Sequence, residues 1–253
     1  MRNILLRAIK TIYPFATVLV LWHFISYIEL FPSFFFPAPK DVLILFFKML
    51  IDGSLLKFTA ITFSSGAIGF FIGAVAGLVL AALCATKTYI RDFFFPLISA
   101  AYPIPAIVWV PISLLWFGFS VKSLIFVVFL ASFFNVFYTT FTGIKSINPV
   151  YVRAAQNLNL KGFAYFREII VFGSFPFIVA GMRLAVGASW RVIVGAEMFA
   201  TTVKGLGWFL WRGSEFFRYD QVFVGMITIA IIGLLLENFV LRKIEKKTLD
   251  VWY

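Results

Sequence analysis

Charged residues are scarce in this chain of 253 residues and make up 13% of it, whereas hydrophobic residues make up 62%. A soluble domain carries about twice that share of charge, because polar side chains must cover its surface. This composition excludes an ordinary water-soluble fold and indicates that the lipid bilayer is the solvent. The net charge of +11 does not indicate nucleic acid as a partner, because most basic residues lie at the ends of apolar segments.

Cysteine and histidine are almost absent, with one residue of each. Cys84 alone cannot form an intrachain disulfide, and its glycine-rich apolar surroundings are typical of a small packed residue. A single histidine, His23, excludes a histidine-rich metal site, so no metal is expected. Few carboxylates remain from which to build the nucleophile-and-base pair of an intramembrane enzyme, and no catalytic residue is predicted.

The chain also lacks a G-x-x-x-x-G-K-[ST] phosphate-binding loop. If ATP drives its activity, another chain must hydrolyse the nucleotide, so ATP and magnesium are not expected as cofactors of this chain. An internal inverted repeat is missing as well, which disfavours a self-sufficient secondary transporter.

Long apolar runs are what the sequence has in abundance. Six of them could cross ~30 Å of hydrocarbon at ~20 residues each. We therefore predict an all-α polytopic membrane protein of about six transmembrane helices, forming one domain over residues 1–253. A basic segment precedes the first run as in a secretory signal, but no A-x-A cleavage site follows, so this helix should stay uncleaved. The runs are Thr11–Leu30, Phe58–Ala85, Phe93–Phe117, Leu124–Thr142, Phe175–Thr201 and Gln221–Leu241.

The distribution of basic residues predicts the orientation. With both termini inside, thirteen of the 22 Lys and Arg residues lie in cytoplasmic segments and seven in outer ones, while Arg183 and Arg191 fall in the fifth run. Because Lys and Arg accumulate on the cytoplasmic side, we expect both termini there. On the outer side, Asp41–Leu50 could form a short helix lying at the membrane interface.

Two patterns mark particular runs. Prolines 96, 103, 105 and 111 interrupt the third run. A broken helix is tolerated where a cavity or neighbouring helices satisfy the backbone, so this run either lines a pathway or is a kinked packing helix. Gly69, Gly73 and Gly77 share one face of the second run, which predicts close packing against another helix.

A short helix with capping residues at both ends is predicted in the long polar loop of about residues 143–173. Asn148 suits the N-cap and Pro149 the first helical position. Asn159 suits a left-handed cap at the end of the helix. Ala154 and Ala155 would let another surface approach closely. Short loops are the default, so an elaborate loop suggests a soluble partner.

This segment resembles the cytoplasmic Glu-Ala-Ala loop of permease subunits of bacterial binding-protein-dependent ABC importers. Further motifs in the order and spacing of that family cover nearly the whole chain and are similar to its nitrate, sulfonate and taurine branch. They are Phe36-Pro37-Ala38-Pro39, Pro103-Ile104-Pro105, Trp109-Val110-Pro111, Leu115-Trp116-Phe117-Gly118, Phe175-Pro176, Gly181-Met182-Arg183, Val194-Gly195-Ala196-Glu197, Gly205-Leu206-Gly207 and Phe216-Phe217-Arg218-Tyr219-Asp220.

The resemblance implies the permease subunit of an ATP-driven importer in the bacterial inner membrane, working by alternating access. Its substrate would be a small anion such as a sulfonate, taurine, nitrate or bicarbonate. A vitamin-precursor pyrimidine is the alternative substrate, and a secondary transporter is the alternative class. The implied partners are ABC ATPase subunits, a second permease copy or a related chain, and an extracytoplasmic solute-binding protein.

The family's coupling helix, which docks on the ATPase, corresponds here to the loop helix. Arg153 replaces the family's Glu, Asn159 replaces its Gly, and Phe172 replaces its first Pro after the loop. Arg153 either meets an unusually acidic groove on the ATPase or merely adds to the positive cytoplasmic charge. The residues predicted at this contact are Tyr151, Val152, Arg153, Ala154, Ala155, Leu158, Asn159 and Leu160.

The resemblance also places the fifth run along the translocation path. Charges inside a span are costly unless they face a cavity or the bundle interior, so Arg191 and Glu197 are candidates for the path. The alternative is a buried structural role, which we expect for Arg183. The outer segment Lys204–Asp220 holds three basic residues and two acidic ones, with Arg191 deeper, and positive potential along such an entrance would favour anions. The residues predicted to line the path are Pro103, Pro105, Trp109, Trp190, Arg191 and Glu197.

Overall fold

The computed structural model describes residues 2–200 and 202–237, with the backbone alone for residues 2–12. Within these residues every regular element is helical and no strand occurs, which confirms the all-α prediction. The elements are α1 (Arg2–Tyr27), α2 (Pro39–Ile51), α3 (Ser54–Thr86), α4 (Thr88–Ala101), η1 (Ala106–Trp109), α5 (Val110–Phe117), α6 (Val121–Lys145), α7 (Pro149–Asn157), α8 (Gly162–Tyr165), η2 (Phe166–Val171), α9 (Phe172–Phe199), α10 (Leu206–Glu215) and α11 (Tyr219–Leu235).

Three stretches are long and apolar enough to cross a membrane unaided: α3, α6 and the continuous run Gly162–Phe199. They confirm the second, fourth and fifth predicted spans as helices. The helices of the first and sixth spans give shorter apolar stretches within the described residues, Tyr13–Tyr27 and Tyr219–Leu235. The predicted ends of the fifth span at Thr201 and of the sixth at Leu241 lie outside those residues.

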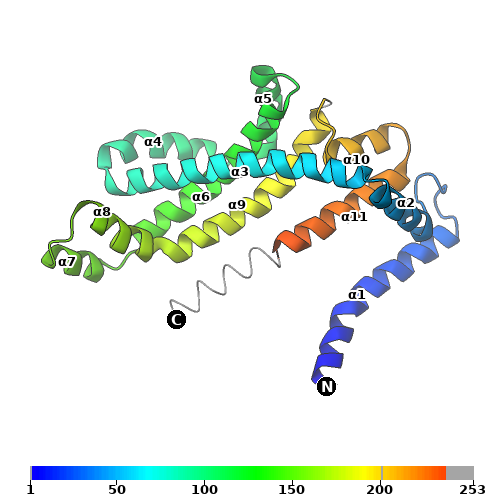
Figure 1. Ribbon diagram of the computed structural model, residues 1–253, viewed down its shortest axis with the longest axis horizontal. Helices are drawn as coiled ribbons and strands as arrows, with labels where there is room; N and C mark the ends of the chain where they lie inside the picture. The colour runs from blue at the N-terminus through cyan, green and yellow to red at the C-terminus, as the bar shows by residue number, and fades with distance from the viewer. Residues whose placement is uncertain (1, 201, 238–253) are drawn as a thin grey trace.

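The third predicted span is broken, as its prolines indicate. Its two halves, Thr88–Ala101 and Ala106–Phe117, meet at an angle of 94°. Pro103 and Pro105 lie in the break. Proline has no backbone N–H and its ring clashes with the preceding turn of a helix, so two prolines this close together favour a break. Pro96 lies inside α4 and Pro111 in the first turn of α5, so these two prolines do not interrupt a helix as predicted. After the turn, α5 stands at the top of Figure 1 and packs against α6, where Trp116 and Phe117 contact Phe126.

The centre of the fold is a close three-helix packing of α3, α6 and α9. In Figure 1, α6 and α9 run side by side and α3 crosses them. The structure places Gly69, Gly73 and Gly77 of α3 against α6. A Cβ added to Gly69 would lie 2.7 Å from the Cβ of Val128, and one on Gly77 would lie 2.8 Å from the carbonyl oxygen of Phe133. Such spacing leaves no room for a side chain, so glycine permits this approach.

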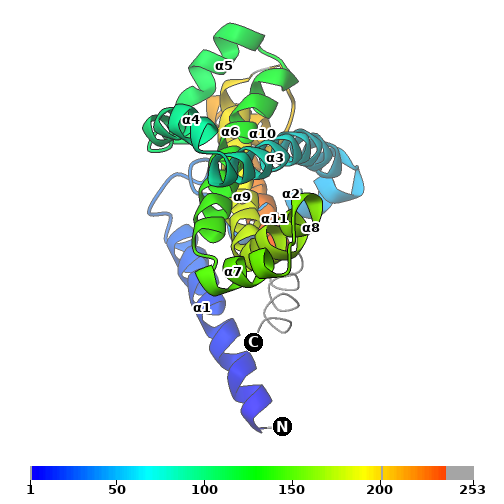
Figure 2. The ribbon, with the colours of Figure 1, turned by 90° about the vertical axis from the view of Figure 1, so that its left-hand side faces the viewer.

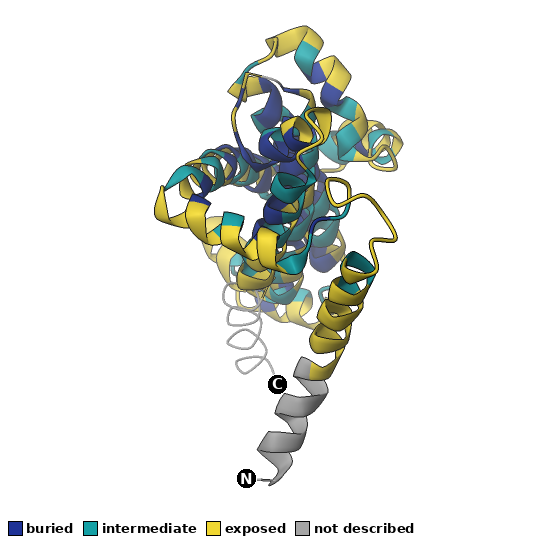
Figure 3. Cartoon of the chain, turned by 90° about the vertical axis from the view of Figure 1, so that its right-hand side faces the viewer, coloured by how far each residue is buried: buried dark blue, intermediate teal, exposed yellow. Residues whose placement is uncertain are grey.

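Helix α1 leaves the bundle instead of packing along it. Figures 2 and 3 show it pointing away from the other helices toward the N-terminus, with exposed residues along its described surface. It is attached near its end, where the Nε1 of Trp22 donates to the carbonyl of Pro37 at 3.0 Å and the Trp22 ring stacks on Phe223. Most of its described surface, from Tyr13 to Tyr27, is therefore uncovered by the described part of the chain.

The bundle has two distinct ends. One carries α7 and α8, and the side-chain nitrogen of Lys145 there donates to the carbonyl of Ala85 at the end of α3, at 3.1 Å. The opposite end carries α2 and α10 (Figure 1). We refer to them as the α7 end and the α10 end. Helix α2 confirms the short helix expected at Asp41–Leu50.

Candidate coupling and translocation sites

The loop helix forms where its capping residues predict it, as α7. The side chain of Asn148 accepts a hydrogen bond from the backbone N–H of Val150 at 2.9 Å, and Pro149 occupies the first turn. Asn159 has φ of +56° at the other end. The N–H of Leu160 donates to the carbonyl of Ala155 at 2.9 Å, which closes a left-handed C-terminal cap. The helix ends are thus fixed by local sequence.

Helix α7 presents an apolar stripe away from the bundle. Tyr151, Ala154 and Leu158 are all exposed, Leu158 to 75%. Residues three and four apart share one side of a helix, so these three form a continuous surface. Ala155, by contrast, is 1% exposed and is covered by its own chain. Its side chain therefore does not reach the surface that we predicted it to share with Ala154.

Arg153 belongs to a different side of α7. With Val152 and Gln156 it lines a pocket of about 570 Å³, which also includes Lys145 and Tyr165. The residues lining this pocket include two cations and no carboxylate. Arg153 is exposed and lies apart from the apolar stripe, so its reversed charge is not at the centre of that surface.

A second pocket lies where the third span breaks. It has a volume of about 230 Å³ and is formed by the break itself, by α6 and by α9. Pro105 and Arg191, both predicted for the path, line it together with Asn135 and Tyr102. Arg191 is the only charged residue among those that line this pocket. The structure therefore brings an arginine to the broken helix.

The local geometry leaves the Arg191 guanidinium available to a ligand. One of its terminal nitrogens lies 3.7 Å from where a Cβ on Gly187 would stand, so the side chain lies back over a glycine of its own helix. Asn135 uses one amide proton to reach the carbonyl of Ala131 at 2.7 Å, which leaves a second N–H. Together these groups supply donors suited to an oxyanion.

The remaining predicted path residues do not join this pocket. Trp190 directly precedes Arg191 and lies on another side of α9, where its Nε1 donates to the carbonyl of Ile229 on α11 at 3.3 Å. Pro103 is exposed in the break, and Trp109 is half-buried in η1. The described residues thus group only Pro105 and Arg191 of the predicted set around one cavity.

Glu197 requires a correction, because it is fully buried inside the chain. Its Oε2 accepts hydrogen bonds from the Thr62 hydroxyl at 2.9 Å and from the backbone N–H of Gly207 at 2.8 Å. The N–H of Leu206 in turn donates to the Thr62 hydroxyl at 2.8 Å. The carboxylate therefore joins α3 and α9 to the N-terminus of α10, where the helix dipole favours negative charge. It holds the α10 end together and does not line a path.

The glycines beside this carboxylate are needed for space. A Cβ on Gly205 would overlap the carboxylate of Glu197, and one on Gly207 would overlap the carbonyl of Val194. The Gly205-Leu206-Gly207 motif thus lets the chain pass close over Glu197. Sequence reasoning missed Thr62 and Asn135, although a polar residue within each of two apolar runs was a signal for both.

Taken together, the fold and these sites define a helical membrane protein with a bent, pocket-lining span and an exposed helix at one end. Residues 73–247 match the family model described as "Binding-protein-dependent transport system inner membrane component". Three relatives agree with that match. TauC of Escherichia coli, a taurine transport system permease protein, is 29% identical over 94% of this chain and 87% of its own.

SsuC of Bacillus subtilis, whose name refers to aliphatic sulfonates transport, is 28% identical over 92% of this chain and 84% of its own. The nitrate import permease protein NrtB of Leptolyngbya laminosa is 30% identical over 69% of this chain and 62% of its own. The chain belongs to the family of binding-protein-dependent transport inner membrane components, the permease subunits of ABC importers. The alternative of a self-sufficient secondary transporter is not favoured.

Proposed function

We propose that this chain is the permease subunit of an ATP-driven importer for a small oxyanion, with a sulfonate or nitrate as the preferred class. Its relatives are named for taurine, aliphatic sulfonates and nitrate. The observation that carries the substrate class is Arg191 in the pocket at the broken third span. An intramembrane arginine is retained where it has a function, because its desolvation is costly.

The chemistry of this pocket matches such a cargo. Within the described residues Arg191 has no carboxylate partner, so none of their carboxylates neutralises its charge. A guanidinium pairs with planar or tetrahedral oxyanions through two parallel N–H groups. A pyrimidine would instead call for neutral hydrogen-bonding groups and an aromatic surface. The pocket therefore favours the anion over the pyrimidine alternative.

The Arg191 pocket gives a direct test of this function. Arg191→Gln should reduce uptake of taurine and nitrate by about tenfold or more, since losing one charged hydrogen bond costs roughly 1.5–3 kcal/mol. Arg191→Lys keeps the charge and should retain part of the uptake. Uptake is measured with labelled substrate in cells that also express the ATPase and the binding protein. Co-purification of the ATPase serves as the control for assembly, and normal uptake by the Gln variant would exclude Arg191 from the pathway.

The partners proposed for this chain follow from the surfaces that it leaves uncovered. The apolar stripe of α7 would dock on an ABC ATPase, which supplies ATP hydrolysis and binds magnesium. The uncovered α1 supports a second permease copy or a related chain beside this one. A solute-binding protein would deliver the anion at the α10 end.

The proposed orientation puts the α7 end in the cytoplasm and the α10 end outside. The N-terminus would then be cytoplasmic, as would the C-terminus, whose residues 238–253 lie outside the described part of the chain. Motion of α7 on ATP binding would reach the pocket through α9, which runs from η2 beside α7 to the pocket. The two permease subunits would rock so that the pocket opens first to one side and then to the other.

A further inference from the structure

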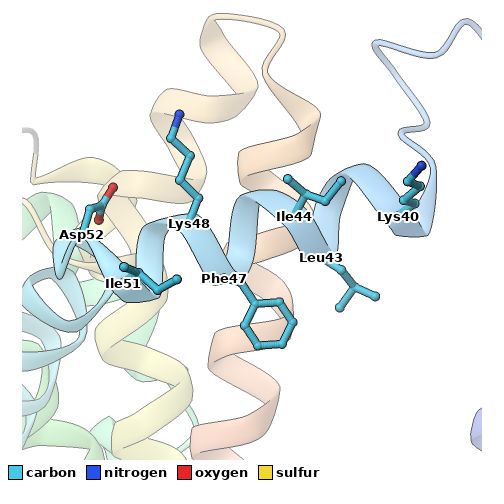
Figure 4. A pocket seen from close by; sticks show the side chains of 7 residues that line it. All are labelled: Lys40, Leu43, Ile44, Phe47, Lys48, Ile51 and Asp52. Atoms are coloured by element: carbon cyan, nitrogen blue, oxygen red, sulfur yellow. The ribbon is translucent and has the colours of Figure 1, made fainter.

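Helix α2 carries an apolar surface that its own chain leaves uncovered. Four apolar residues, Leu43, Ile44, Phe47 and Ile51, contribute to the lining of a shallow hollow of about 900 Å³ along this helix. Phe47 is 55% and Ile51 86% exposed. Figure 4 shows Leu43 and Phe47 pointing to the same side of α2. A continuous apolar surface of this kind requires a covering that is itself apolar.

Three charged residues of α2, Lys40, Lys48 and Asp52, border the same hollow. In Figure 4 the side chains of Lys40, Lys48 and Asp52 point up, whereas Phe47 points down. Hydrogen bonds from the hydroxyl and the backbone N–H of Ser54 hold the pKa of Asp52 below its ordinary value. Its carboxylate is therefore ionised at neutral pH and belongs in water. Lys48 and Asp52 thus share the upper side of α2 with Ile44, while Leu43 and Phe47 form the adjoining apolar side.

The third side of α2 fixes how the helix is oriented. Val42 and Met49 are buried in a cluster that includes Leu206 and Phe209 of α10 and Val224 of α11. This packing prevents α2 from rotating about its axis. Helix α11 continues below α2 in Figure 4, so the apolar side of α2 faces the direction in which the membrane-spanning helices run.

We propose that α2 lies in the lipid–water interface at the α10 end, with Leu43, Phe47 and Ile51 in the acyl chains and Lys40 and Lys48 at the phosphates. An amphipathic helix lying in this way buries its apolar side ~5–10 Å below the headgroups. Lysines at the boundary extend their ammonium groups toward the headgroups while their stems stay in the apolar region. The bound partner is phospholipid, and its phosphates complement the two lysines.

A protein occupant fits this arrangement less well. A water-soluble binding protein approaching from outside would meet the side with Lys48 and Asp52 first. Phe34 and Phe35, in the segment that joins α1 to α2, are exposed apolar residues as well. Helix α2 would therefore anchor the α10 end at a fixed depth in the bilayer.

Spin-label accessibility tests the proposal in the assembled importer reconstituted in phospholipid bilayers. Cys84 is the only cysteine, so a Cys84→Ala background allows one label at a time. Labels at Phe47→Cys and Ile51→Cys should collide several-fold more with oxygen, which partitions into lipid, than with a water-soluble nickel chelate. A label at Lys48→Cys, one residue further along the helix from Phe47, should show the reverse ratio.

Two outcomes at position 47 would overturn the proposal. Protection from both oxygen and nickel would mean that a second permease copy or the binding protein covers this side. Free access of the nickel chelate would mean that the apolar side faces water. Leu43→Cys gives an independent reading on the same side if a label at position 47 impairs assembly, and its ratio is judged by the same two outcomes.

Discussion

Replacing Glu197 with alanine should destabilise the protein strongly, lowering its thermal unfolding midpoint in detergent by about 5 °C or more. The change leaves the N–H of Gly207 without its acceptor and the Thr62 hydroxyl without its carboxylate partner. Each buried polar group left unpaired costs about 1–3 kcal/mol. For a chain of this size 1 kcal/mol corresponds to roughly 2–4 °C. Glu197→Gln keeps an acceptor oxygen and should lose less.

Glycine variants supply the matched control for this prediction. Gly205→Ala should destabilise the protein as Glu197→Ala does, because its methyl group would overlap the Glu197 carboxylate. Gly66→Ala adds the same methyl group to α3, where it would lie 3.7 Å from Ile193, an ordinary contact. Its unfolding midpoint should be unchanged. If Glu197→Ala unfolds at the wild-type temperature, the carboxylate does not hold the α10 end together.

The second large effect is expected at the stripe of α7. Leu158→Asp should abolish co-purification of the ATPase and uptake while leaving the unfolding midpoint unchanged. Burying a leucine in a contact stabilises it by about 1.5–3 kcal/mol, so losing Leu158 weakens binding roughly tenfold or more, and the added charge weakens it further. Because Leu158 is exposed in the chain itself, folding should not suffer. Ala154→Trp, on the same stripe, should act in the same direction by overfilling the contact.

Arg153→Glu is the control on the other side of α7. Arg153 lines the pocket with Lys145 and lies apart from the apolar stripe, so the Arg153→Glu variant should still bind the ATPase. If Arg153→Glu abolishes binding while Leu158→Asp does not, the ATPase contacts the pocket side of α7 and the stripe has another role. Ala155→Trp is unsuitable as a docking test, because the buried Ala155 would be overfilled within its own chain.

The features that the sequence predicted correctly depend on local chemistry. Asn148 and Asn159 cap α7, and these caps were predictable because a cap depends only on the residues of its own turn. The break at Pro103 and Pro105 follows from the missing N–H and the fixed ring of proline. The apolar runs predicted the helices because a segment in lipid must satisfy its own backbone, and hydrogen bonds within a helix do so.

The features that it did not predict depend on contacts between distant parts of the chain. Glu197 and Thr62 are separated by 135 residues, and no pattern in either run shows that they meet. Whether Ala154 or Ala155 faces outward depends on how α7 packs against η2, which its own composition does not determine. The sequence placed Arg191 on the fifth span. That Arg191 lies beside the broken third span could be seen only from how α6 and α9 pack in the structure.

ATP-dependent uptake by the reconstituted importer tests the central claim most directly. Proteoliposomes would contain this chain with its ATPase, and labelled taurine or nitrate would be supplied together with the solute-binding protein. Anion accumulation is predicted to require hydrolysable ATP on the side of the ATPase and to be lost when the ATPase is omitted. Equal accumulation without the ATPase, or with a non-hydrolysable ATP analogue, would show that the chain transports by itself and would contradict its assignment as the permease subunit of an ATP-driven importer.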